Sequence, residues 1–180
     1  LEDMLGVPAF DGDYPAGWRL TALWLTNLGR FLNREQQAAV AIKTEEDRLN
    51  QHIAKCSALL QGKRIVLYVG RPLLYFDPAW VLELFSLYRV TLAGIVLMDD
   101  VLSDDQRADL YEELKKQTTI PCYSLVEGEA VVDTADIVVT THELADVGKK
   151  QLFLPILPLA GVGGIITLMT KLVRLAQRHD

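Results

Sequence analysis

The sequence has few cysteines and no excess of basic residues. Its 180 residues contain only Cys56 and Cys122, which are too few and too isolated for a disulfide framework or for a zinc site with closely spaced ligands. The formal net charge of -6 offers no basic surface to a phosphate backbone. These deficits exclude a disulfide-rich scaffold, predict that nucleic acid is not a partner, and favour a cytoplasmic protein.

Export and membrane signals are also missing. The chain starts at Leu1 without a basic and apolar leader, which predicts a processed chain or a part of a longer protein. Residues 151–170 lack charged side chains over about the length that spans a bilayer. That stretch contains two prolines and three glycines, which interrupt a lipid-exposed helix. We therefore expect a strand, a loop and a helix start there, and no membrane span.

The composition predicts one domain with a substantial core, because 50% of the residues are hydrophobic and 23% are charged. The first sixteen residues are rich in Gly, Pro and Asp and predict an irregular lead-in. Apolar residues at helical spacing predict a helix over 17–31, and a second helix with Asn33 as its N-cap runs to about Leu60. Residues 1–61 are thus expected to form a lead-in and two helices that pack on a domain of residues 62–180.

Strands and helices alternate after Gly62. Continuous apolar runs predict strands over 64–69, 92–98, 122–126, 137–140 and 151–154. Helical spacing predicts helices over 78–88 and 164–178, and a capping box of Ser103 and Gln106 opens another helix that runs to about Gln117. This alternation predicts an α/β fold, namely a Rossmann-like three-layer αβα domain with a mostly parallel sheet of four to five strands.

Ligands of such sheets bind at the carboxyl ends of the strands, where the strand order reverses. Gly70 and Arg71 follow the first predicted strand, where glycine permits close backbone approach and Arg can hold an anionic group. A tight turn with a solvated Arg explains them equally well, and the spaced glycines of a dinucleotide fingerprint are missing. His142 follows the fourth strand and is a candidate to bind, protonate or ligate a group; alternatively, Thr141 only caps a short helix.

Two further groups lie at predicted strand ends or helix starts. Gly161 and Gly163 precede the last predicted helix, where they either present free amides to an anion or let the helix pack closely on the sheet. Asp99 and Asp100 end the second strand and are similar to the phosphoacceptor and magnesium sites of flavodoxin-like receiver domains. A solvated turn explains these two carboxylates as well.

The remaining reactive side chains suggest no chemistry. His52 falls on a polar helix face, and His179 lies at the terminus. Cys56 and Cys122 are expected in the core, because free cysteine is among the most buried residue types. No Ser/His/Asp or Cys/His set has a recognisable spacing, so no catalytic residue and no metal ligand is assigned.

Several segments resemble the nitrogenase component 1 family, which includes nitrogenase molybdenum–iron protein subunits, cofactor-assembly scaffolds and tetrapyrrole reductases. Residues 60–70 are similar to the family's helix end, Gly-Lys-Arg strand and Gly-rich turn. Residues 136–143 resemble the family's segment ending in Ser-His-Glu, and Pro155 with the glycines before the last helix resembles its closing loop. Residues 7–8 and 18–28 resemble the lead into the family's last domain. The resemblance identifies the chain as the C-terminal Rossmann-like domain of such a protein.

The resemblance implies an oxidoreductase in which three similar α/β domains surround a metal centre. An ATP-dependent iron–sulfur reductase delivers electrons in this family, so that reductase and a homologous or identical component 1 subunit are the implied partners. The implied cofactor of the full-length protein is an iron–sulfur cluster or related metallocofactor. None is expected on this chain alone, because the family's cluster-ligating cysteines lie mainly in earlier domains. Residues 154–159 also lack the cofactor-ligating His of the catalytic nitrogenase subunit, and Arg71 stands where that subunit has a second glycine.

These observations predict one wall of a metallocofactor or substrate pocket in a nitrogenase-like oxidoreductase or cofactor-assembly scaffold, inactive alone. The residues expected to line this wall are Gly70, Arg71, His142, Gly161 and Gly163. Arg71 would balance negative charge, and the glycines would offer backbone amides. The alternatives are a non-catalytic flavodoxin-like binding or regulatory domain that uses Asp99 and Asp100, and a domain kept only for subunit association.

Overall fold

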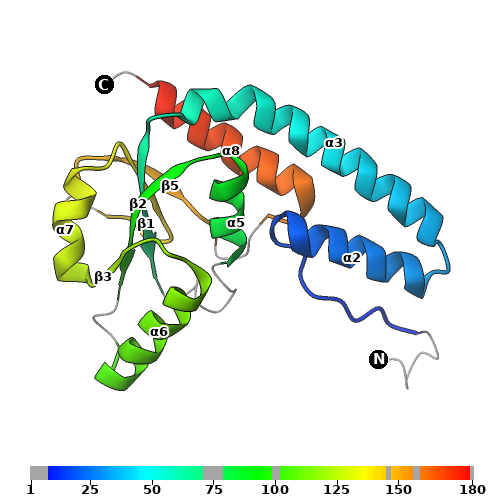
Figure 1. The fold of residues 1–180 in the computed structure, drawn as a ribbon, viewed down its shortest axis with the longest axis horizontal. Coiled ribbons are helices and arrows are strands. Elements are labelled where there is room, and N and C mark those ends of the chain that lie inside the picture. The colour runs from blue at the N-terminus through cyan, green and yellow to red at the C-terminus, as the bar shows by residue number, and fades with distance from the viewer. Residues whose placement is uncertain (1–7, 71–78, 99–101, 145–146, 156–158, 179–180) are drawn as a thin grey trace.

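The centre of the molecule is a five-stranded sheet with the order β3-β2-β1-β4-β5, in which all paired strands run parallel. The structure, a computed structural model, describes residues 8–70, 79–98, 102–144, 147–155 and 159–178. The strands are β1 (Arg64–Val69), β2 (Thr91–Leu97), β3 (Cys122–Tyr123), β4 (Ile137–Thr140) and β5 (Lys150–Phe153). Helices lie on both faces of the sheet (Figure 1). The predicted Rossmann-like α/β fold is confirmed.

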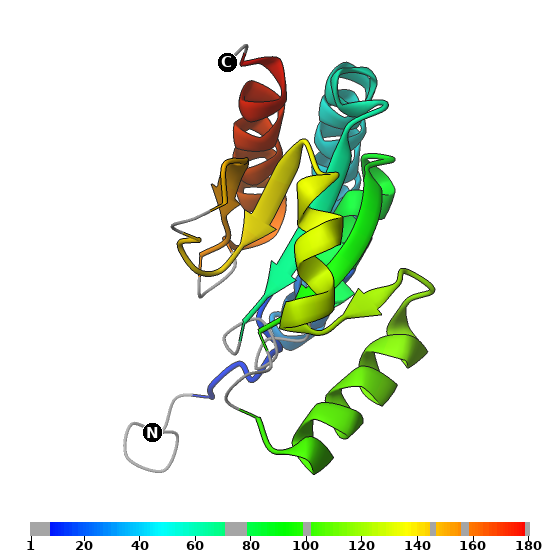
Figure 2. The same ribbon diagram turned by 90° about the vertical axis from the view of Figure 1, so that its left-hand side faces the viewer.

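The described residues form six helices: α2 (Gly17–Phe31), α3 (Glu35–Leu60), α5 (Ala79–Leu87), α6 (Asp104–Gln117), α7 (Leu125–Asp133) and α8 (Gly161–Gln177). The larger core joins one face of the sheet to α3, α5, α6 and α8. α7 covers the other face, where Val66, Val96 and Val138 are fully buried (Figure 2). Burial on both faces explains why β1 reads as a continuous apolar run. None of the helices in the described ranges is long and apolar enough to cross a membrane.

The two N-terminal helices lie side by side and extend away from the sheet (Figure 1). A Cβ added to Gly29 would overlap the Cβ of Ala38, so the helices are in close contact near their connection. The predicted N-cap at Asn33 is wrong, because α3 begins at Glu35 after Arg34. Asn33 instead adopts a left-handed conformation with a φ of 51°, which asparagine tolerates, and thereby closes the end of α2.

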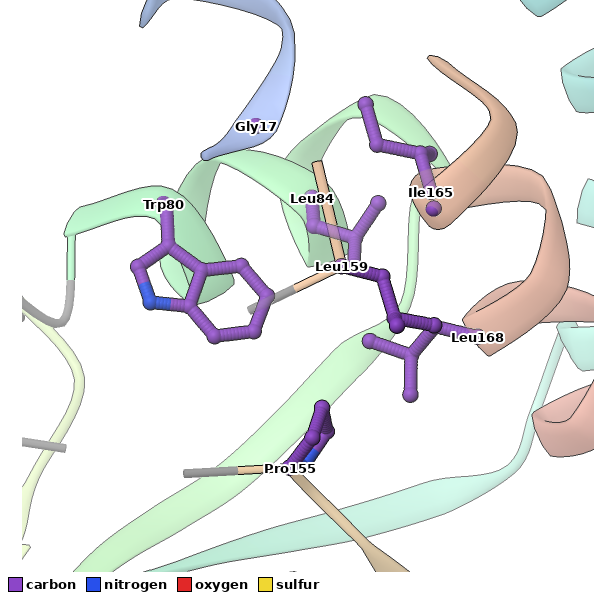
Figure 3. A pocket seen from close by; sticks show the side chains of 8 residues that line it. Gly17, Trp80, Leu84, Pro155, Leu159, Ile165 and Leu168 are labelled. Atoms are coloured by element: carbon purple, nitrogen blue, oxygen red, sulfur yellow. The ribbon is translucent and has the colours of Figure 1, made fainter. Parts of the chain in front are cut away.

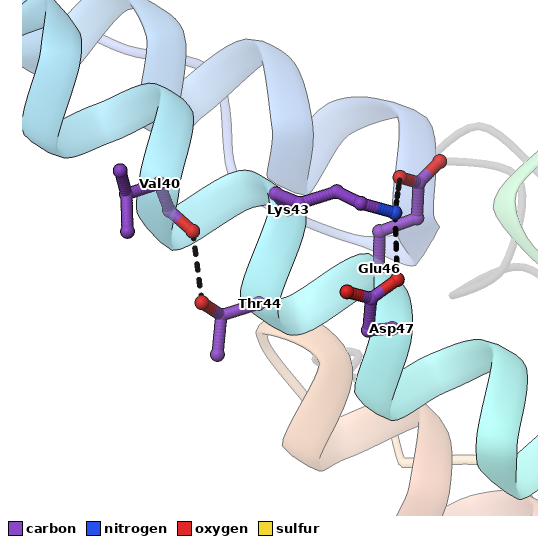
Figure 4. A network of polar contacts seen from close by, with 5 residues as sticks. All are labelled: Val40, Lys43, Thr44, Glu46 and Asp47. Atoms are coloured by element: carbon purple, nitrogen blue, oxygen red, sulfur yellow. Dashed lines mark hydrogen bonds and ion pairs between the residues drawn. The ribbon is translucent and has the colours of Figure 1, made fainter.

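The solvent-facing side of α3 carries ion pairs between successive turns. Lys43 Nζ lies 2.7 Å from Asp47 Oδ1 and 3.5 Å from Glu46 Oε2 (Figure 4). The hydrogen bond and charge of Asp47 are the main reason that the pKa of Lys43 is raised. Such exposed pairs contribute little to stability. The packing of α3 therefore depends on its buried side chains, which include Leu49, Cys56 and Leu60.

Two other predicted boundaries differ from the structure by three residues, and several more differ by one residue. The strand predicted over 122–126 ends at Tyr123, because Ser124 and Glu127 form a capping box that starts α7. The last helix begins at Gly161 rather than Gly164. Gly161 has a φ of 68°, a left-handed conformation that favours glycine, and helical residues follow it directly. The capping box predicted for Ser103 is confirmed at the start of α6.

Candidate functional site

The carboxyl ends of β1 and β4 form the topological switch point of the sheet. β1 connects through α5 to β2 on one side, whereas β4 lies on the other side of β1 and leads to β5. Ligands of open α/β sheets bind at such a switch point. Gly70 follows β1, and Thr141 and His142 follow β4. The structure thus brings two of the predicted site residues, Gly70 and His142, to the same place.

Gly70 is in direct contact with the His142 side chain. A Cβ added to Gly70 would overlap Cε1 of the His142 ring and would lie 2.9 Å from Thr141 Oγ1. The Gly70 N–H donates to Thr141 Oγ1 at 3.3 Å, and the same oxygen lies 2.8 Å from His142 Nδ1. Only glycine leaves room for the imidazole at this position. The Gly70 amide, expected from the sequence to face a ligand, is engaged by Thr141.

Other polar side chains hold the loop that carries His142. Thr140 is fully buried, and its Oγ1 accepts from the His142 N–H at 3.1 Å and donates to the His142 carbonyl at 2.9 Å. The Leu144 N–H donates to Gln151 Oε1 at 3.1 Å, and Gln151 Nε2 donates to the Leu144 carbonyl at 2.8 Å. Residues 141–144 are not helical, so the Thr141 hydroxyl serves Gly70 and His142 rather than an immediately following helix. The loop is therefore fixed by side chains from β4 and β5.

The three glycines at the start of α8 have different surroundings. The Gly161 N–H donates to the Pro15 carbonyl at 3.0 Å, which ties α8 to the lead-in segment. A Cβ on Gly164 would overlap the Leu159 carbonyl, so close packing requires glycine there. Gly163 is exposed, and a Cβ there would have no neighbour within 4 Å. A Cβ on Gly161 would also have no neighbour within 4 Å, but Gly161 is half-buried and its amide is engaged by Pro15, so Gly163 is the exposed one of the two predicted residues. The packing role of Gly164 was not predicted.

A small apolar pocket lies between α2, α5 and α8 (Figure 3). Its lining comprises Gly17, Trp80, Leu84, Pro155, Leu159, Gly164, Ile165 and Leu168. The cavity is about 10 Å³, close to the smallest that holds one water molecule. The buried indole nitrogen of Trp80 has no hydrogen-bond partner among the described residues, and it lies on the side of the ring away from Leu84 and Leu168 (Figure 3). This pocket is too small for a cofactor.

A second polar cluster joins α3, α8 and the residue after α5. His52 Nδ1 lies 2.6 Å from the hydroxyl of the fully buried Tyr88, and Nε2 lies 3.1 Å from Thr170 Oγ1 and 3.5 Å from Cys56 Sγ. Burial lowers the pKa of His52, with a smaller contribution from Lys55. Burial also raises the pKa of Tyr88 and of Cys56. The lowered pKa favours the neutral imidazole, which donates through one ring nitrogen and accepts through the other.

The sequence interpretation of His52 as a residue of a polar helix face is wrong. Its position at i+3 from Leu49 and i−4 from Cys56 puts it beside the buried stripe of α3. This spacing is the sequence feature that could have predicted a partly buried His52. The expectation that Cys56 lies in the core is confirmed, whereas Cys122 is half-buried.

Comparison with known proteins identifies the family to which the chain belongs. The family model described as nitrogenase component 1 type oxidoreductase matches residues 1–160. The chain belongs to this family. The matched range includes residues 60–70 and 136–143, the two segments that meet at Gly70 and His142. A search of the curated proteins gave no match.

Solved nitrogenase structures share the fold of this family member. The structure titled "Nitrogenase Cp1 at pH 6.5" superposes with a TM-score of 0.62 at 14% sequence identity, over 90% of this chain and 43% of that chain. The structure titled "Nitrogenase Cp1 at pH 5" gives a TM-score of 0.61 at 15% identity, over 91% and 41% of the two chains. The chain therefore spans less than half the length of the solved nitrogenase chains that it matches.

Three of the candidate residues belong to segments that the structure does not describe. Arg71, Asp99 and Asp100 lie outside the described residues. Within the described ranges, no three His, Cys, Asp or Glu side chains come together as potential metal ligands. The candidate site of this nitrogenase component 1 type protein therefore consists, within the described residues, of Gly70, Thr140, Thr141 and His142, which are joined by hydrogen bonds.

Proposed function

We propose that this chain forms one wall of a metallocofactor or substrate pocket in a nitrogenase component 1 type oxidoreductase or cofactor-assembly scaffold. The observation that carries the proposal is the contact of Gly70 with His142 at the switch point. The glycine makes room for an imidazole, and two threonine hydroxyls hold that imidazole and its backbone. Such preorganisation of one polar ring on rigid strands is typical of a binding site.

The remaining donors at this edge fit an anionic group. Among the described residues, the ring of His142 forms its hydrogen bond through Nδ1, so Nε2 is available to a ligand. The exposed Gly163 lies in the first turn of α8, where unpaired amides and the helix dipole favour negative charge. Iron–sulfur clusters offer sulfur acceptors whose hydrogen bonds tune their potential. In the proposal, these residues bind and orient such a group, Arg71 adds positive charge, and the bound group supplies the redox chemistry.

The chain is inactive alone in this proposal. Because it spans less than half of the solved nitrogenase chains, we propose that the rest of a longer cytoplasmic protein supplies the cluster ligands. A homologous or identical component 1 subunit and an ATP-dependent iron–sulfur reductase are the proposed partners. The division into a lead-in with two helices (1–61) and a Rossmann-like domain (62–180) remains part of the proposal.

The test compares variants of the full-length gene product, purified without oxygen. Iron, acid-labile sulfide and the rate of cofactor reduction are measured for wild type, Arg71→Ala and His142→Ala. We expect both variants to lose cofactor or to slow its reduction. Glu143→Ala is the control, because Glu143 is exposed beside His142 and should leave both quantities unchanged. Wild-type cofactor content and rate in both Arg71→Ala and His142→Ala would show that the proposed pocket is wrong.

The same metal and sulfide analysis is applied to the isolated 180-residue chain. Iron in the full-length product alone is expected if the cluster ligands lie outside this chain. Iron in neither protein would favour a binding or association domain.

A further inference from the structure

The hydrogen bonds of Thr141 bear on which nitrogen of the neutral His142 ring carries the hydrogen. Thr141 Oγ1 accepts a hydrogen bond from the Gly70 N–H, so one of its lone pairs is used. The hydroxyl has one hydrogen of its own to donate, and His142 Nδ1, at 2.8 Å, is the acceptor within reach among the described residues. A nitrogen that accepts a hydrogen bond is unprotonated. In the neutral ring, the hydrogen is then on Nε2.

Three contacts keep the ring in this arrangement. Gly70 lies against Cε1 and Nδ1, so the edge of the imidazole that bears Nδ1 faces the protein. Thr140 binds both the N–H and the carbonyl of His142, which fixes the backbone from which the ring projects. The Gln151 amide holds the backbone of Leu144 at the other end of the loop. A ring held by its backbone and by one nitrogen presents its second nitrogen in a defined direction.

We propose that Thr141 is a positioning residue that holds His142 as its Nε2–H tautomer, so that the ring donates a hydrogen bond to an acceptor atom of the bound group. The bound group is accordingly one with oxygen or sulfur acceptors at its surface. His142 does not ligate a metal through Nδ1, because that nitrogen is occupied by the Thr141 hydroxyl. This inference rests on the proposed function for the ligand, whereas the tautomer is a property of the chain alone.

The tautomer is measured by nuclear magnetic resonance on the 180-residue chain labelled with ¹⁵N-histidine, at about pH 8.5, two units above the ordinary pKa of histidine. Correlations between ring protons and nitrogens distinguish Nδ1–H from Nε2–H, and a His142→Gln sample assigns the signals among the three histidines. We expect essentially pure Nε2–H in wild type and in Thr141→Ser, and a mixture of both tautomers in Thr141→Val. An Nδ1–H pattern in wild type, or the same pure tautomer in a folded Thr141→Val chain, would overturn the positioning role.

The donor role is measured in the full-length product through substitutions that place an amide at one nitrogen or the other. The side-chain amide of His142→Gln reaches the region of Nε2, whereas that of His142→Asn reaches only the region of Nδ1. We expect the Gln variant to retain most of the cofactor content and the Asn variant to lose it several-fold. The reverse order would overturn the donor role. If Gln, Asn and Ala variants all retain the cofactor, the proposed pocket fails, and the tautomer measurement still decides the role of Thr141.

Discussion

Replacing Tyr88 by Phe tests the hydrogen bond that links α5 to α3. Tyr88 is fully buried, and its hydroxyl lies 2.6 Å from His52 Nδ1. Phenylalanine keeps the edge-on ring contact with His52, whose centroid is 5.7 Å away, and removes only the hydroxyl. Leaving a buried donor or acceptor without its hydrogen-bond partner costs about 1–3 kcal/mol. Because His52 is half-buried and water can reach it, we expect the lower part of this range, about 1–2 kcal/mol.

The assay is urea unfolding of the 180-residue chain at about pH 8, where histidine is neutral. The midpoint should fall without a change in slope, and the melting temperature should fall by roughly 2–4 °C for each kcal/mol lost. Tyr123→Phe is the control, because no hydrogen bond of its hydroxyl is recorded in the described ranges; its effect should stay within about 0.5 kcal/mol. A double-mutant cycle with His52→Leu should show a coupling of at least about 0.5 kcal/mol. Strict additivity, or a Tyr88→Phe chain as stable as wild type, would refute the proposed link.

Three further predictions concern other parts of the fold. Because burial lowers the pKa of His52 in the folded chain, the unfolded state takes up its proton at a higher pH than the folded state does. The free energy of unfolding should therefore decrease from pH 7 to pH 5 more steeply in wild type than in His52→Gln, and a parallel pH profile in urea unfolding would contradict this. Ser124→Ala should cost about 1 kcal/mol by removing the cap of α7, and Ser124→Asn, which keeps an acceptor, should stay close to wild type in the same assay. Gly163→Ala should stabilise the protein by about 0.5–1 kcal/mol, because the site is open and alanine favours helix. Gly164→Ala should instead destabilise the protein by about 1–3 kcal/mol, because the added Cβ clashes with the Leu159 carbonyl. Equal calorimetric melting temperatures for the two variants would be inconsistent with this packing.

The sheet could be predicted from the sequence because its signal is local. β1, β2 and β4 read as short apolar runs, since helices cover both faces of the sheet. The capping box of Ser103 was equally local and was found at the start of α6. Ser124 and Glu127 have the same capping-box spacing, but Ser124 falls inside the run 122–126 that was predicted as a strand, and the cap was not predicted.

The candidate site required information that no local pattern contains. Gly70 and His142 were each expected at a strand end, but their contact depends on β4 pairing with β1 rather than with β3. The role of Thr141 follows from the same pairing, because its hydroxyl bonds a residue 71 positions away. His52 was misassigned for a similar reason, since its partners are distant in sequence: Tyr88 directly follows α5, and Thr170 lies in α8.

Burial divides the long helix α3 into two parts, which we expect to unfold by different routes. Between Ala38, which contacts α2 at Gly29, and Leu49, no residue of α3 is buried. The C-terminal part packs in the main core with β1 and α8. Residues 39–48 can therefore open without disturbing the sheet, and their amide protons should exchange with solvent through local fraying, whereas those near Cys56 and Leu60 should exchange only when the whole domain unfolds. One continuous helix thus belongs to two cooperative units.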